Sequence, residues 1–359
     1  MTRFPMILCL LLALPAALPA QQPERYTLES GPAAVYNLVG TLRVEPGEGA
    51  GVVVQVTRAG GDATKLKIGQ GEIDGRATLR VIYPDDRIRS GRTGHGGTTQ
   101  LRVRDDGTFG DYEEDGHGHR NRHGWEEGRR VTIGDGTDGL DARADLVVRV
   151  PKGERVGVYL AVGAVTVANV DGELSVDAHS APVTASGTRG ALSVDVGSGD
   201  VRISQAQGDV DVDTGSGTVE VSGFQGTALS VDTGSGDVTG SGLECDDLSV
   251  DTGSGEVRLT AVTSPQVSLE TGSGAVSAEL RRDVASLSVE TGSGDVAIRA
   301  PASLGAAVEI ETSSGDIETD FPLQVTRHAR DHMVGTIGDG KGTIAIETGS
   351  GGIRLLKGN

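Results

Sequence analysis

The chain has 359 residues and is acidic, with 51 Asp and Glu against 32 Lys and Arg and a formal net charge of −19. This balance excludes nucleic-acid binding, which needs basic patches. The 56 glycines and the low aromatic content, 3% of the chain, argue against a conventional large core. They favour thin stacked layers of small and β-branched side chains.

Residues 1–20 predict a secretory signal peptide. An apolar run follows the basic residue Arg3 and ends before the small residue Ala20. The run is too short and wrongly flanked for a membrane span, so we expect export to the periplasm, the cell surface or the exterior. After cleavage Cys245 would be the one cysteine of the chain, so we expect no intrachain disulfide.

Residues 21–150 alternate apolar and polar side chains in stretches such as 35–60 and 76–86, which is the period of β-strands. We expect an N-terminal β-strand capping region, because an open end of a stacked β structure exposes unpaired strand edges. A polar insertion rich in glycine and charge, at about 86–130, interrupts this region, and we expect it to be a mobile loop.

The insertion contains a short His-rich tract next to acidic residues: His117, His119 and His123. Such tracts can bind zinc, copper or nickel through imidazole. Arg120 and Arg122 oppose a cation, and nothing in the sequence fixes the ligand geometry. We therefore expect weak metal binding at most, and the three histidines stay a candidate loop site.

An eleven-residue unit recurs along residues 151–359, for example ALSVDTGSGDV at 228–238 and SLSVETGSGDV at 286–296. The middle serine of its turn returns after 18 to 21 residues and, at the last step, after 36: Ser198, Ser216, Ser235, Ser254, Ser273, Ser293, Ser314, Ser350. A fixed period near 19 residues is typical of a repeat architecture. We expect the 36-residue gap to hold two turns, one of them degenerate.

Each unit is predicted to be a strand, a tight glycine corner, a second strand and a connector. One unit cannot bury its apolar face alone, so neighbouring units must stack. The sequence therefore predicts an all-β fold, a parallel β-solenoid (β-helix-like) with coils of about 19 residues. Antiparallel hairpins in a sandwich or propeller are the alternative, although propeller blades of about 40 residues are twice this period.

In such a solenoid the acidic residue before each corner would stack into an outward column: Asp195, Asp213, Asp232, Asp251, Glu270, Glu290, Glu311, Glu347. Further carboxylates follow the corner: Asp200, Asp237, Glu256, Asp295, Asp316. Carboxylates about 5 Å apart repel by about 0.8 kcal/mol per pair in water, and Ca²⁺ would relieve this repulsion. The candidate calcium ladder is Asp232, Asp237, Asp251 and Glu256. The alternative is a solvated acidic edge whose side chains accept N–H bonds at the corners.

Equivalent outward residues repeat from coil to coil, and this pattern favours a protein that is not an enzyme. Solenoids can carry polysaccharide-acting sites, for which His328 and His332, in the interrupted coil, are the best candidates. The serine of Gly-Ser-Gly lacks the context of a nucleophile elbow. Cys245 has the acidic neighbours Glu244 and Asp246, which disfavour the thiolate, so we expect a half-buried structural role.

The repeated SVDTGSGDV units after a signal peptide resemble a bacterial family of exported β-strand-repeat proteins called "putative adhesins" of unknown function. The resemblance covers about residues 156–356 and implies an envelope or extracellular β-solenoid without assigned catalytic residues. We therefore expect an adhesive, binding or scaffolding module whose ligand is an envelope or extracellular glycan or protein. The alternatives are a calcium-stabilised structural rod and a polysaccharide-acting enzyme. Apart from Ca²⁺, no cofactor is expected.

Overall fold

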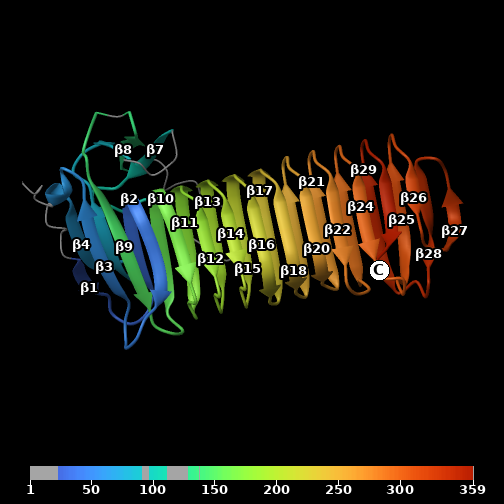
Figure 1. The fold of residues 1–359 in the computed structure, drawn as a ribbon, viewed down its shortest axis with the longest axis horizontal. Coiled ribbons are helices and arrows are strands. Elements are labelled where there is room, and N and C mark those ends of the chain that lie inside the picture. The colour runs from blue at the N-terminus through green and yellow to red at the C-terminus, as the bar shows by residue number, and fades with distance from the viewer. Residues whose placement is uncertain (1–22, 91–96, 111–127, 137, 359) are drawn as a thin grey trace, which may run out of the picture.

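The structure is a computed structural model that describes residues 23–90, 97–110, 128–136 and 138–358. The protein is an all-β rod in which most strands belong to one hydrogen-bonded system, with a separate three-stranded sheet at the N-terminal end (Figure 1). Neighbouring coils pair in parallel, so the predicted β-solenoid is confirmed. No helix in the described ranges has the length and apolarity that a membrane crossing requires.

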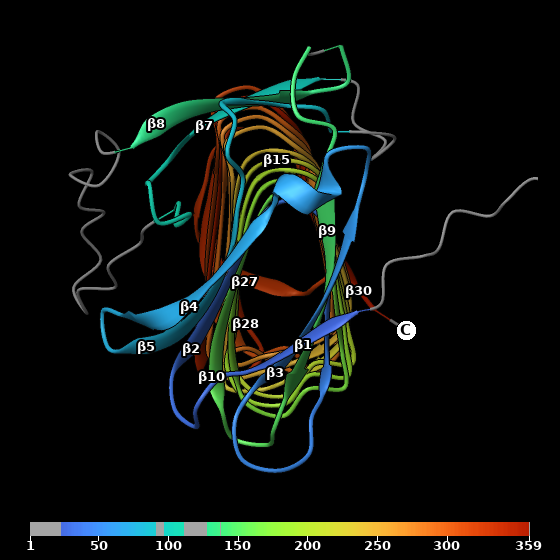
Figure 2. The ribbon, with the colours of Figure 1, turned by 90° about the vertical axis from the view of Figure 1, so that its left-hand side faces the viewer.

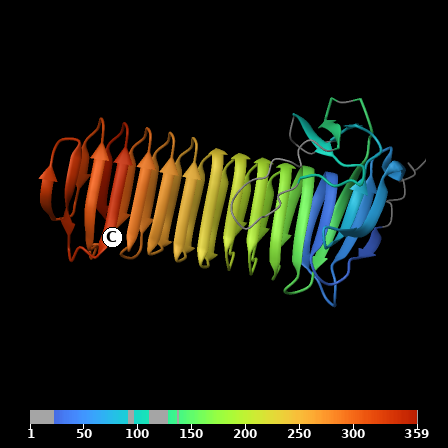
Figure 3. The ribbon, with the colours of Figure 1, turned by 180° about the vertical axis from the view of Figure 1, so that it is seen from behind.

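Each regular coil has two strands on opposite sides of an apolar interior, so the rod seen end-on is a flattened ring (Figure 2). Leu229 and Val231 are buried, whereas Ser230 and Asp232 alternate with them on the outer surface. Burying one such aliphatic side chain contributes about 1.5–3 kcal/mol. Seen from behind, the ladder of strands is equally continuous (Figure 3).

The first strand of each coil carries the SVDT-type sequence. These first strands are β11 (Glu173–Ser180), β13 (Leu192–Ser198), β15 (Val210–Ser216), β17 (Ala228–Ser235), β19 (Asp247–Thr252), β21 (Gln266–Thr271), β23 (Ser286–Thr291), β25 (Ala306–Thr312) and β29 (Gly342–Thr348). The second strands are β12 (Val183–Ser186), β14 (Val201–Ser204), β16 (Val219–Gln225), β18 (Val238–Glu244), β20 (Val257–Thr263), β22 (Val276–Leu280), β24 (Val296–Ala300), β26 (Ile317–Thr319) and β30 (Ile353–Lys357).

At the N-terminal end two long strands, β2 (Ala33–Pro46) and β10 (Arg155–Ala168), each run through both walls of the rod. The first half of β10 pairs with β11 and its second half pairs with β12. Beyond β2 the pairing continues through β9 and β3 to β1 in one wall and through β5 to β4 in the other. These strands, with one short 3₁₀ helix, are β1 (Glu24–Thr27), β3 (Val53–Ala59), η1 (Ala63–Lys65), β4 (Lys67–Ile73), β5 (Arg76–Ile82) and β9 (Arg143–Val150).

The predicted loop at about 86–130 contains strands, so the interpretation of the whole segment as a mobile loop is wrong. The separate sheet consists of β6 (Arg87–Ile88), β7 (Thr98–Val103) and β8 (Arg129–Gly134). The segments on either side of β7 are rich in glycine and charged residues, and this composition led to the loop prediction despite the alternating residues of β7. Ile88 of β6 forms a parallel bridge with Leu140, and Phe109, which follows β7, meets the ring of Tyr36 in β2 edge-on at 5.9 Å, so this part of the chain adjoins the rod.

The C-terminal end departs from chain order. The last coil, β29 and β30, lies between the coil of β23 and β24 and the coil of β25 and β26, and pairs in parallel with both. A hairpin of β27 (Leu323–His328) and β28 (His332–Ile337) pairs antiparallel with β25 and closes the tip. The C terminus therefore lies inside the rod's outline rather than at its tip (Figure 1).

The prediction that the 36-residue gap holds two stacked turns is wrong. The gap holds the closing hairpin and the return of the chain to a position one coil back. The inserted coil fits both neighbours because its buried Ile344 and Ile346 continue the apolar ladder, and Glu347 continues the acidic column.

Candidate functional site

The register places the acidic residues of the first strands in one outward column. In spatial order the column runs Asp195, Asp213, Asp232, Asp251, Glu270, Glu290, Glu347, Glu311. Asp177 extends it toward the N terminus, where the stacked rings of Tyr159 and Tyr36, 4.2 Å apart, take the next two positions. The outer face of this wall is therefore a continuous acidic row that ends at two buried aromatic rings.

The repeated Thr-Gly-Ser-Gly stretch has a structural explanation in the packing of the corner. The hydroxyl of Thr252 donates to the carbonyl oxygen of Gly236 in the preceding coil at 3.3 Å, and Thr291 repeats this bond to Gly274 at 3.1 Å. A Cβ on Gly236 would lie 2.0 Å from the carbonyl oxygen of Gly217, so a larger residue does not fit. The motif that recurs most often thus builds the fold rather than a site.

The carboxylates after the corner also serve the backbone. Asp237 accepts a hydrogen bond from the backbone N–H of Glu256 at 2.9 Å, and Asp295 accepts one from Gly352 at 2.8 Å. These carboxylates do not form a continuous column, because uncharged residues take some of the aligned positions: Thr218, Ala275 and Gly352. This geometry agrees with the solvated acidic edge, in which Asp side chains accept hydrogen bonds from backbone N–H groups at the corners.

The candidate calcium ladder consists of aligned neighbours in two columns, Asp232 with Asp251 and Asp237 with Glu256. Burial, and next the negative charge of Asp232, raise the pKa of the Asp251 carboxyl. Within the described residues, no group of three or more His, Cys, Asp or Glu side chains gathers closely enough to hold a metal ion. Calcium binding stays a prediction.

The second metal candidate, the loop tract with His117, His119 and His123, lies outside the described residues, as do residues 1–20 of the predicted signal peptide.

The catalytic candidates lie on the closing hairpin and not on an interrupted coil. The backbone of His328 ends β27, and His332 begins β28, where Glu311 is its register partner. The imidazole Nε2 of His332 lies 3.2 Å from a carboxylate oxygen of Glu309. This contact is an exposed pairing at the rod's tip.

Cys245 is more deeply buried than expected, with 6% of its surface exposed. Burial is the largest cause that raises the pKa of its thiol, and the charges of Asp246 and Asp247 raise it further. A protonated, enclosed thiol suits a packing role.

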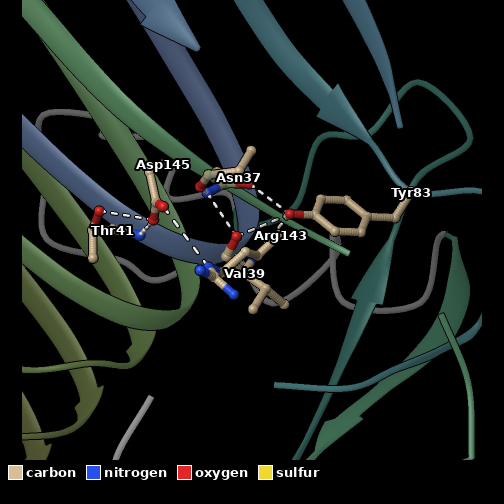
Figure 4. A network of polar contacts seen from close by, with 7 residues as sticks. Asn37, Val39, Thr41, Tyr83, Arg143 and Asp145 are labelled. Carbon is tan, nitrogen blue, oxygen red and sulfur yellow. Dashed lines mark hydrogen bonds and ion pairs between the residues drawn. The ribbon is translucent and has the colours of Figure 1, made fainter. Parts of the chain in front are cut away.

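A buried polar network lies within the N-terminal region and connects β2, β9 and the residue after β5 (Figure 4). The hydroxyl of Tyr83 donates to the side-chain oxygen of Asn37 at 2.9 Å, and the amide nitrogen of Asn37 donates to the carbonyl oxygen of Ala144 at 2.7 Å. Burial raises the pKa of Tyr83, and both side chains are 1% exposed or less. The network provides hydrogen-bond partners for backbone groups where β2 bends from one wall of the rod to the other, and the burial of these side chains suits a structural role.

A polar groove of about 350 Å³ lies at the second corner of the coils, where each second strand returns to the next first strand. Its lining residues are Asn169, Gly187, Arg189, Gln205, Gln207, Gly223 and Gln225. The groove could not be predicted from the main repeat, because the strongest repeat signal is that of the Gly-Ser-Gly corner. A signal was present in the sequence, because a four-residue connector recurs at 169–172, 187–190, 205–208 and 223–226 with the sequences NVDG, GTRG, QAQG and GFQG. Each connector consists of a variable residue, a buried residue, a polar residue and a glycine.

Comparison with known proteins gives one family. No curated protein is significantly similar to the chain. The family model described as Toastrack DUF4097 matches residues 133–356. The chain belongs to the Toastrack DUF4097 family. The match confirms the resemblance to a β-strand-repeat family, and the Toastrack region begins in β8, ends in β30 and includes both the acidic column and the polar groove.

Among solved structures, the Toastrack chain is similar to the crystal structure of a "putative cell adhesion protein" from Clostridium sporogenes ATCC 15579. The sequence identity is 12% and the TM-score is 0.22, with 94% of this chain and 100% of that chain covered.

Proposed function

We propose that the protein is an exported, non-catalytic binding or scaffolding module that acts in the cell envelope or outside the cell. One observation carries the proposal: the outward residues of the walls are equivalent from coil to coil and stay in register along the rod. Such columns offer a ligand many similar contacts, whereas catalysis needs a singular arrangement of groups. The ligand is an envelope or extracellular glycan or protein that contacts several coils.

The export step rests on residues 1–20, whose basic start, apolar run and small-residue end are typical of a secretory signal. Expression of the full chain with a C-terminal tag tests it. We expect the tagged protein outside the cytoplasm with a new N terminus near Gln21. An intact N terminus on cytoplasmic protein would contradict export.

Binding without turnover is tested with the purified protein from Gln21 on arrays of glycans and purified envelope polymers. We expect retention on at least one polymer class and no release of reducing ends or fragments. Product release that disappears in His332→Ala, with an unchanged melting temperature, would contradict the non-catalytic part and favour the enzyme. A protein retained by no surface would contradict the binding function.

A calcium-stabilised rod is the second candidate, favoured by the alignment of Asp232 with Asp251 and by the raised pKa of Asp251. Burial is the first cause of this raised pKa and the charge of Asp232 is the second, and a bound divalent cation would relieve the repulsion between the two carboxylates. The test is the melting temperature in EDTA, followed by the addition of Ca²⁺ or of Mg²⁺ as the control. A rise with Ca²⁺ that Asp232→Asn removes would support the candidate, and equal curves in EDTA and Ca²⁺ would end it.

A further inference from the structure

The polar groove has two rows of side chains that run along the rod, with one buried residue between them in each coil. One row is Asn169, Gly187, Gln205 and Gly223, and the other is Arg189, Gln207 and Gln225, joined coil to coil by parallel bridges. The intervening residues Val170, Thr188, Ala206 and Phe224 are buried. At the coil spacing of a parallel sheet, the groove spans about 15 Å of the rod.

The first row is held in the left-handed region of backbone conformation, which favours glycine. Gly187 and Gly223 adopt it with φ of 64° and 63°, and two amide residues share it, Asn169 with φ 56° and Gln205 with φ 54°. Ala261, further along the rod, also adopts it, so the conformation alone does not mark a site. What distinguishes the groove is that amide side chains alternate with glycines there.

The glycines leave room between the amides. A Cβ on Gly187 would lie 2.5 Å from the side-chain oxygen of Asn169, so this amide leans over the glycine of the next coil. A Cβ on Gly223 would meet nothing closer than 3.8 Å. The row is therefore a series of amide groups with gaps, and the side chains of Asn169, Gln205, Gln207 and Gln225 are exposed.

The lining is uncharged apart from Arg189, although the chain carries a net charge of −19. Acidic residues take the second-row positions just beyond the two ends of the groove. Asp171 lies at one end and pairs with Lys152 at 2.9 Å, and Glu244, the register partner of Gln225, lies at the other end. Each Asn or Gln offers one acceptor oxygen and two donor hydrogens, and Arg offers five donors. Sugar hydroxyls, which both donate and accept, match this set.

A peptide fits the groove less well. The backbone groups of its floor are already used between coils, as in the bonds from Gly187 N to Ser204 O and from Gln205 N to Ser222 O, so a peptide strand cannot add by backbone pairing. Apolar side chains would also lack a pocket, because the intervening residues are covered.

We propose that the groove binds an uncharged oligosaccharide that lies along the rod axis, with its hydroxyls bound to the amides and to Arg189. This assignment rests on the proposed binding function, names a ligand class for it and places the site at the corner of the coils instead of on the walls.

Side-chain NH₂ signals in ¹⁵N NMR spectra test the assignment directly. The probes are cellohexaose, maltohexaose, mannohexaose and xylohexaose, with a polygalacturonate hexamer as the charged counterpart and a Ser- and Asn-rich hexapeptide as the peptide arm. We expect at least one neutral hexasaccharide to shift the signals of Asn169, Gln205, Gln207 and Gln225 and to leave the amides of the acidic wall unchanged.

Two sets of variants, each with a control, separate the groove from the rest of the rod. Arg189→Ala and Gln207→Ala should weaken binding of that hexasaccharide at least tenfold, whereas Glu244→Ala, in the same row but outside the groove, should not. Gly187→Gln should displace the amide of Asn169, whose oxygen would lie 2.5 Å from the new Cβ, at a backbone conformation that Gln205 already shows. Gly242→Gln, with φ 63° and no atom within 3.8 Å of its Cβ, is the control outside the groove for the same backbone conformation.

The outcomes are distinct. Shifts caused by the hexapeptide or the polygalacturonate but by no neutral sugar overturn the assignment. A chain that binds glycan arrays with unchanged strength in Arg189→Ala and Gly187→Gln keeps the proposed function and loses the groove. A chain that binds no sugar and no envelope polymer loses both.

Discussion

The middle of the rod and its C-terminal end are built from the same coil but differ in the order of the chain. From β11 to β24, the coils that touch are consecutive in sequence. At the end, the coil made last lies between two coils made earlier. Matching inward and outward columns therefore decide which coils can pair, but they do not fix the order of the coils, because the coil of β29 and β30 fits between two coils that are consecutive in sequence.

The largest difference should appear when one coil is removed from each region, with a small effect in the middle and a large one at the C-terminal end. Deletion of residues 247–265 removes one complete middle coil, because Asp247 and Gln266 are register partners. Its neighbours can then pair directly, and we expect a shorter rod with a melting temperature within about 5 °C of the parent. Truncation after Lys341 removes the inserted coil instead and leaves β23 and β25 without their shared partner.

For the truncated chain we expect loss of protection from hydrogen exchange in residues 306–337 and aggregation through the exposed edges. Hydrogen exchange with mass spectrometry and size-exclusion chromatography measure the two variants side by side. A truncated chain that keeps β25 protected would show that the tip is stable without the inserted coil.

The next effect concerns the corner glycines of the middle region. Gly236→Ala should lower the free energy of unfolding by about 2–4 kcal/mol, because the new Cβ meets the backbone of the neighbouring coil. Ser235→Ala, at the exposed position before it, should change this free energy by less than about 0.5 kcal/mol. Urea denaturation followed by circular dichroism compares them, and equal midpoints would refute the close-approach explanation.

A smaller effect separates two threonines that occupy equivalent corners. The hydroxyl of Thr271 donates to Gly255 at 3.3 Å, whereas the buried hydroxyl of Thr233 has no hydrogen-bond partner among the described atoms. Thr271→Val should cost about 1 kcal/mol, and Thr233→Val should be neutral or stabilising. Val196 already occupies the equivalent position one coil before Thr214, so valine fits there. Equal losses in the two variants would contradict this assignment.

The smallest effect concerns the charge of the acidic column. The pKa of Asp251 is raised in the folded state, so the ionised carboxylate destabilises the fold, and this destabilisation grows as pH rises through the raised value. Asp251→Asn should raise the melting temperature at pH 7 by about 1 °C, with no difference at a pH where the carboxyl is protonated in both states. Ser249→Asn, outward on the same strand, is the uncharged control. A lower melting temperature for Asp251→Asn would contradict the repulsion and favour a bound cation.

Much of the regular region could be predicted from the sequence. The alternation of Leu229 and Val231 with Ser230 and Asp232 fixes which side chains are buried, and the recurring glycine corner fixes the register. The acidic column follows from these two facts, because equivalent residues of stacked coils must align.

The order of the last coils could not be predicted, because spacing along the chain does not report spatial order when the units are interchangeable. The polar groove was missed for a related reason. The outward residues of its connectors differ in kind from coil to coil, so the recurring four-residue connector carries only a weak repeat signal, although Gln205 and Gly187 occupy one structural position. The loop prediction at 86–130 failed at β7, where six alternating residues were hidden among glycines and charges.

The out-of-order coil also has a consequence for when the protein can finish folding. Synthesis delivers residues 306–337 before 342–357, so the hairpin at the tip leaves the ribosome before the strands that join it to the rod. The middle of the molecule can assemble progressively as the chain emerges, while the tip must wait until residues 342–357 have been made. A nascent chain of this protein therefore keeps an unfinished end until β29 and β30 have emerged.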